Sequence, residues 1–127
     1  MKLEKVIVGF FVILALALNV VFVSGDISNP AHHNVWVLTL AILINLIAAG
    51  LILGDRTHLG ALLLATSLVA NLLLISARLI WVVNADADDQ SLNTEQMVLI
   101  VSLAIGALMS NLISVFTLSV DTIISRR

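Results

Sequence analysis

The sequence predicts an all-α protein, a bundle of four transmembrane helices, and three observations lead to this prediction. The chain has 127 residues, of which 61% are hydrophobic and only 11% are charged, whereas about a quarter of the residues in a soluble domain are charged. The apolar residues fall into four runs long enough to cross a bilayer as helices. Within the third run, residues 59–77 lack the alternation of a barrel strand, so helices are expected to satisfy the backbone in lipid.

We expect one membrane domain over residues 1–127. Its four spans are predicted at about 6–23, 30–53, 59–83 and 94–124. The loops between them are short, and short loops make consecutive helices antiparallel neighbours.

The first span begins after Lys2 and Lys5 and ends in the Val-Ser-Gly sequence at 23–25, a layout that also resembles a secretory signal peptide. Its apolar stretch is longer than the apolar region of a signal peptide, which has about 7–15 residues. Asn19 inside it repeats a pattern seen in the later spans. We therefore expect this segment to be retained as a helix.

The ends of the second and fourth spans carry helix-capping residues. Asn29 is predicted to cap the second helix, with Pro30 at its first position, and Gly54 is predicted to end it. Asn93 and Gln96 have the spacing of a capping box at the start of the fourth helix.

The basic residues predict the orientation. Those outside the spans all fall on one side of the membrane: Lys2, Lys5, Arg56, Arg126 and Arg127. The positive-inside rule places this side, with both termini, in the cytoplasm. Trp36 and Trp81 fall near the opposite boundary, where aromatic residues act as interface anchors.

Each span contains one asparagine followed by two aliphatic residues: Asn19, Asn45, Asn71 and Asn111. The last three lie near the middle of their spans, and Asn19 is shifted outward. An amide in hydrocarbon needs a hydrogen-bond partner, so we expect all four to face inward. They either join helices to one another or form a solute or ion site near the midplane.

Further polar residues extend this pattern into a seam. Ser67, Asn71 and Arg78 share one face of the third helix, and Ser110 and Ser114, with Asn111 beside them, share one face of the fourth. Arg78 is the only charge well inside a span. It either snorkels to the interface and pairs with an acidic group, or acts as an anion-attracting residue in a pathway.

Small residues predict helix contacts. Ser102, Gly106, Ser110 and Ser114 recur every four residues in the fourth helix, and Gly50 and Gly54 form a GxxxG pair in the second. Such residues let two backbones approach closely, within one chain or between chains.

Several functions are not expected. The chain has no cysteine, which excludes disulfides and thiolate sites. It has no basic run for nucleic acid and no catalytic constellation, so we expect neither nucleic-acid binding nor enzyme activity. His32 and His33 are adjacent, a spacing that suits no metal site, and no cofactor is expected.

The segments Leu62–Asn71 and Leu103–Ser114 resemble those of an uncharacterised family of small bacterial four-span membrane proteins. The resemblance implies the four-helix fold and a bacterial inner-membrane location. It implies no activity.

Two main functions are compatible with the sequence, besides a weaker one, lipid or quinone binding by Arg78 near the head groups. The first is a homo-oligomeric ion channel or permeation protein with a polar interior of asparagine, serine and arginine. The alternative is an accessory or assembly subunit of a larger membrane complex, with the small residues and asparagines as contact surfaces. Either protein would have the lipid bilayer as its environment, with a second copy or a larger membrane protein as its partner and, for the channel, a small ion as its solute.

Overall fold

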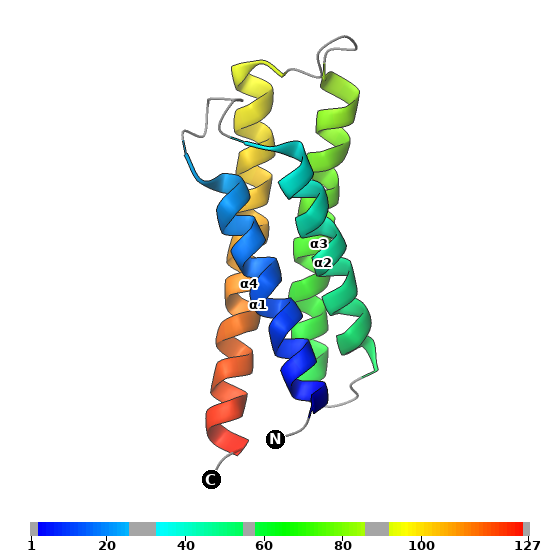
Figure 1. The fold of residues 1–127 in the computed structure, drawn as a ribbon, viewed down its shortest axis with the longest axis vertical. Helices are drawn as coiled ribbons and strands as arrows, with labels where there is room; N and C mark the ends of the chain where they lie inside the picture. Colours follow the sequence, from blue (N-terminus) through cyan, green and yellow to red (C-terminus); the bar gives the residue numbers. More distant parts are fainter. Residues whose placement is uncertain (1–2, 26–32, 55–57, 86–91, 126–127) are drawn as a thin grey trace.

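The computed structural model describes residues 3–25, 33–54, 58–85 and 92–125, and these form four α-helices and no strand (Figure 1). The helices are α1 Leu3–Val23, α2 Val35–Leu53, α3 His58–Asn84 and α4 Thr94–Ser125. All four are long and apolar enough to cross a membrane. The predicted four-helix membrane fold is confirmed, and the protein is a multi-pass membrane protein.

The helices run up and down in a ring. α1 packs against α2 and α4, and α3 packs against the same two helices, with the most extensive contact between α3 and α4. Both chain termini lie at one end of the bundle, which we call the terminus end (Figure 1). α1 stops well short of the opposite end of the bundle, whereas α3 and α4 extend beyond the last turn of α1.

The start of α2 differs from the prediction. Asn29 and Pro30 lie outside the described residues, but residues 33 and 34 are not helical and α2 begins at Val35. Asn34 is its N-cap, because its backbone is extended and its side-chain oxygen accepts a hydrogen bond from the Trp36 N–H at 2.8 Å. A span starting at residue 30 is therefore wrong.

The other predicted helix ends agree with the structure. The backbone N–H of Asn93 donates to the Gln96 side chain at 3.0 Å, and the N–H of Gln96 donates to the Asn93 side chain at 2.8 Å. This is the reciprocal pair of a capping box. Gly54 is the C-cap of α2. Gly25, with a φ of 97°, turns the chain sharply after α1, in a conformation that suits glycine.

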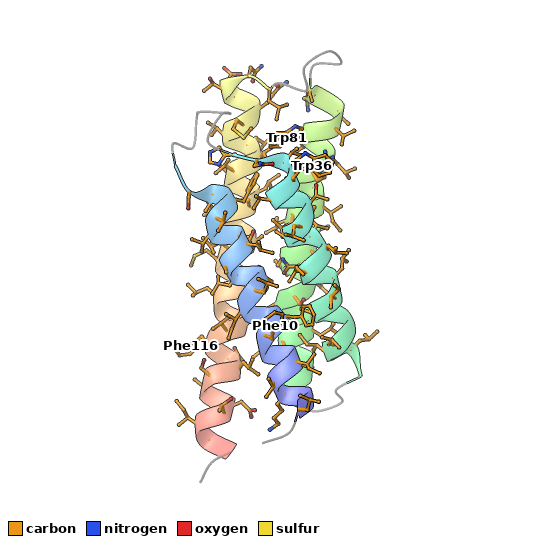
Figure 2. All side chains as sticks on the ribbon, viewed as in Figure 1. Phe10, Trp36, Trp81 and Phe116 are labelled. Carbon is orange, nitrogen blue, oxygen red and sulfur yellow. The ribbon has the colours of Figure 1, made fainter. Side chains whose placement is uncertain are left out.

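The buried apolar residues form two clusters. The smaller one, towards the terminus end, consists of Val12, Ala48, Ile52 and Leu63. The larger one fills the other half of the bundle and includes Phe22, Leu38, Leu74, Trp81 and Met97. Large apolar side chains such as Phe10 and Phe116 are exposed on the outer surface (Figure 2), as expected where lipid replaces water as the solvent.

The two tryptophans differ in their surroundings. Both lie towards the end opposite the termini (Figure 2). Trp36 is 73% exposed and suits an interface anchor. Trp81 is buried, with its ring 6.4 Å from that of Phe22. The prediction of an anchor is therefore wrong for Trp81, because the rotation of α3 turns this side chain into the core.

Candidate functional site

Each helix turns one asparagine into the interior of the bundle. Asn19, Asn45, Asn71 and Asn111 are exposed by 0%, 1%, 5% and 3%, respectively. Each lies in the buried stripe of its helix, which in α1 is formed by Val12, Ala15, Asn19 and Phe22. All four asparagines thus face inward, as expected from the cost of leaving an amide in lipid.

Contacts between the helices show how three of these asparagines are aligned along the bundle. The Asn71 side chain donates to the backbone carbonyl of Asn45 at 3.3 Å, so these two residues are neighbours. In the α3–α4 pair, the hydroxyl groups of Thr66 and Ser114 lie 2.5 Å apart. α3 and α4 are antiparallel, so the residue five positions after Thr66 in α3 is level with the residue five positions before Ser114 in α4. Asn71 is therefore level with residue 109. At 1.5 Å per residue, Asn111 is about 3 Å away along the axis.

Asn19 belongs to the same level. A Cβ atom added to Gly9 would lie 3.8 Å from Cδ2 of Leu118, so these two residues face each other across α1 and α4. Ten residues further along α1, Asn19 is level with residue 108, about 4.5 Å along the axis from Asn111. Asn19 lies towards the C-terminal end of α1, as predicted, but it joins the others because α1 stops short of the opposite end (Figure 1). We call the four residues the asparagine layer.

Only small residues flank the layer on one side, whereas two large residues, Phe22 and Leu74, are among those on the other. One turn towards the terminus end, the inward positions are Ala15, Ala48, Ser67 and Ser114, all buried. One turn towards the opposite end, the inward positions are Phe22, Ala41, Leu74 and Ala107, which are also buried. The layer therefore lies between the two apolar clusters.

The hydrogen bonds of the layer are incomplete. Asn45 donates to the Ala41 carbonyl at 2.8 Å, and Asn71 donates to the Ser67 carbonyl at 3.0 Å, both within their own helices. Within the described part of the chain, four buried atoms have no hydrogen-bond partner: Nδ2 and Oδ1 of Asn19, Oδ1 of Asn71 and Nδ2 of Asn111. Each buried, unpaired polar group costs about 1–3 kcal/mol. The amides thus retain unused donors and acceptors at the centre of the bundle.

The predicted polar seam is present only in part. Ser67, Asn71, Asn111 and Ser114 are buried together in the interior, whereas Ser110 is only half-buried. The hydroxyl contact between Thr66 and Ser114 links α3 to α4. Thr66 was not predicted as a site residue. Its hydroxyl also bonds to the carbonyl groups of Leu62 and Leu63, which hold it in place.

Arg78 does not line the layer. It lies seven residues beyond Asn71, about 10 Å along the helix, with the buried Leu74 between them. Its Nε donates to the Thr39 hydroxyl at 3.2 Å, so Arg78 joins α3 to α2. No carboxylate among the described residues pairs with it, and the aspartates of the 86–91 loop lie outside those residues. The predicted seam from Arg78 into α4 is not observed.

His33 is a buried polar residue whose role the sequence did not reveal. It is only 4% exposed, and its Nδ1 lies 2.7 Å from the carbonyl oxygen of Phe22. A carbonyl only accepts, so Nδ1 carries the proton and donates it. Because Phe22 is in the last turn of α1, His33 satisfies a helix-end carbonyl that α1 leaves open. His32 lies outside the described residues.

The predicted small-residue ridge contacts α3 along only part of its length. A Cβ on Gly106 would lie 3.1 Å from the Leu73 side chain, and Ser114 touches Thr66. Ser102, in contrast, is exposed. A spacing of four residues turns about 40° further around the helix at each step, which carries Ser102 away from the contact.

The glycine pair of α2 has no neighbour within the described chain. A Cβ on Gly50 or Gly54 would meet nothing within 4 Å, and both glycines are exposed. Neither glycine therefore packs closely against another of the described helices.

The sequence matches the profile of a family of unknown function (DUF6394) over residues 32–122. The match includes α2, most of α4 and three residues of the asparagine layer. No curated protein and no solved structure matches the chain. The matched region is most of the chain, and the protein therefore belongs to the DUF6394 family, a family of unknown function.

Proposed function

We propose that the protein is a permeation protein of the bacterial inner membrane, with both termini in the cytoplasm, whose solute path crosses the asparagine layer. The proposal is carried by one observation: buried amide atoms without partners lie at mid-depth in a membrane bundle. Transport proteins place solute sites at this depth, where helices present polar groups to one another.

The proposed path runs inside each bundle. Asn45, Asn71 and Asn111 are buried by their own chain. An axis between copies of the protein would meet the exposed apolar side chains instead. A homo-oligomer would therefore hold one path per subunit.

The layer is closed on both sides in this conformation. Phe22 and Leu74 cover it towards one end, and Val12 and Leu63 lie beyond the small residues at the other. A solute would therefore be occluded in the layer, and passage requires the apolar side chains or the helices to move. This arrangement fits a carrier or a gated channel better than an open pore.

Reconstitution tests the proposal. Purified protein in liposomes is assayed by stopped-flow light scattering for water, urea and glycerol, and with a potassium-sensitive dye for K⁺. We expect at least one of these to cross several-fold faster than in protein-free vesicles, and Asn71→Leu to abolish the gain. Asn84→Leu is the matched control, because Asn84 is exposed at the end of α3. If all four permeants cross at the protein-free rate, the proposal is wrong.

One observation favours the accessory-subunit alternative. Gly50 and Gly54 offer a narrow, exposed strip of α2 with no neighbour within the described chain, and another protein's helix could approach closely there. In that case Gly50→Leu should abolish co-purification of a membrane partner from native membranes. Ala65→Leu, at an exposed position of α3, should not.

A further inference from the structure

We infer that the asparagine layer binds a small neutral molecule that both donates and accepts hydrogen bonds, with water as the smallest member of this class. The inference rests on the proposed function, because it names the class of solute that the layer would accept.

The unpartnered atoms set the chemistry of the ligand. Asn19 and Asn71 each present a free acceptor oxygen, and Asn19 and Asn111 each present a free amide donor. Donors and acceptors are thus mixed within the layer. A water or urea molecule uses both kinds at once. A cation would face the amide hydrogens, and an anion would face the carbonyl lone pairs.

The distribution of charge in the bundle also favours a neutral ligand. None of the inward positions within one turn of the layer carries a charge. Arg78 lies about 10 Å from Asn71 along α3 and is bonded to Thr39. Among the other described charged side chains, Glu95 and Asp121 lie towards opposite ends of α4. An ion in the layer would lose its hydration without gaining a counter-charge, whereas a neutral molecule avoids this cost.

The flanking residues set a limit on size. Towards the terminus end the neighbours are alanine and serine, and on the other side the buried Phe22 and Leu74 lie one helical turn from the layer. The ligand must therefore be small enough to lie among four asparagine side chains below a phenylalanine and a leucine.

The first experiment measures hydration of the layer directly in the wild-type protein, so no variant has to fold. Protein labelled with ¹⁵N-asparagine and ¹⁵N-alanine is placed in lipid bilayers, and solid-state NMR follows the transfer of magnetisation from water. We expect the side-chain amides of Asn19 and Asn111 to gain signal nearly as fast as that of the exposed Asn84. The buried backbone amide of Ala104 should gain signal several-fold more slowly. Layer signals as slow as that of Ala104 would overturn the inference.

Parallel flux measurements separate this inference from the proposed function. Water or urea flux through a hydrated layer, without K⁺ flux, supports both. A hydrated layer without flux of any permeant contradicts the proposed function and leaves the site itself supported. K⁺ flux that is lost in Asn71→Leu overturns the inference of a neutral solute while supporting permeation through the layer.

Discussion

The side-chain amide of Asn71 donates a hydrogen bond to the backbone carbonyl of Asn45, a residue 26 positions earlier in the chain. The bond crosses from α3 to α2 at the level where Asn19 and Asn111 also face the interior. The bond joins α2 to α3, and of the four side-chain amides in the layer it uses only that of Asn71. Other amide atoms of the layer remain unpaired, which is more polar capacity than helix joining requires.

Asn19→Leu is expected to leave the bundle folded and at least as stable as the wild type. Asn19 is fully buried, and both polar atoms of its amide lack partners within the described chain. Replacing it with an apolar side chain of similar size therefore breaks no hydrogen bond within the protein, and it removes two buried polar groups that cost about 1–3 kcal/mol each when no water pairs with them. Unfolding in mixed micelles, followed by circular dichroism, should show a free energy of unfolding no lower than that of the wild type. A clear loss of stability would mean that the Asn19 amide bonds to another group of the protein.

Asn71→Leu is expected to be less stable than Asn19→Leu. This change removes the bond to the Asn45 carbonyl, and interhelical hydrogen bonds in membranes contribute about 0.6–2 kcal/mol. The change also removes the unpaired Oδ1 of Asn71, which offsets this loss. The same unfolding assay should therefore show a free energy of unfolding below that of Asn19→Leu, which breaks no such bond. Asn84→Leu serves as the control and should leave stability nearly unchanged. A free energy of unfolding for Asn71→Leu equal to that of Asn19→Leu would contradict the assigned hydrogen bond.

Gly106 and Gly50 should respond differently to enlargement. A Cβ on Gly106 would lie 3.1 Å from the end of the Leu73 side chain, which can shift, so Gly106→Ala should be tolerated. Gly106→Leu overfills the α3–α4 contact and should cost about 1–3 kcal/mol. A Cβ on Gly50 would meet nothing within 4 Å and the residue is exposed, so Gly50→Leu should leave the stability of the isolated protein unchanged. Equal losses for the two leucine variants would show that Gly50 also contacts a helix.

His33→Ala should loosen the end of α1. The change removes the donor to the Phe22 carbonyl and the ring packed 5.7 Å from that of Phe22, and a lost hydrogen bond of this kind costs about 0.5–1.5 kcal/mol. Hydrogen exchange in bilayers should become faster at Phe22, Val23 and Ser24 and stay unchanged near the start of α4. His33→Gln, which retains a donor, should restore part of the protection. Unchanged exchange in His33→Ala would contradict the capping role.

The sequence predicted those features that depend on neighbouring residues. The pair Asn93 and Gln96 capped α4 as expected, because a capping box forms within one turn. The start of α2 was predicted at Pro30 and was wrong, because α2 begins at Val35. The structure selects Asn34, and the preceding His33 is held by Phe22, eleven residues away.

In the candidate site, too, the sequence predicted what depends on local context but not what depends on contacts between distant residues. Hydrophobic context alone predicted that the four asparagines face inward. Their common level depends on how the helices are shifted along one another, which Thr66, Ser114 and Gly9 reveal only in the folded protein. Helix rotation likewise turned Arg78 towards Thr39 and Trp81 into the core.

The solute path through the asparagine layer is tested by comparing the solute permeability of the wild-type protein with that of Asn19→Leu in matched liposomes. The amount of folded protein in each sample is determined by circular dichroism and gel filtration. We predict that water or urea crosses several-fold faster with the wild-type protein than in protein-free vesicles. With Asn19→Leu, the rate should fall to that of the protein-free vesicles although the variant is folded and no less stable. An Asn19→Leu variant as permeable as the wild type, or a wild-type protein no more permeable than lipid alone, would contradict a solute path through the asparagine layer.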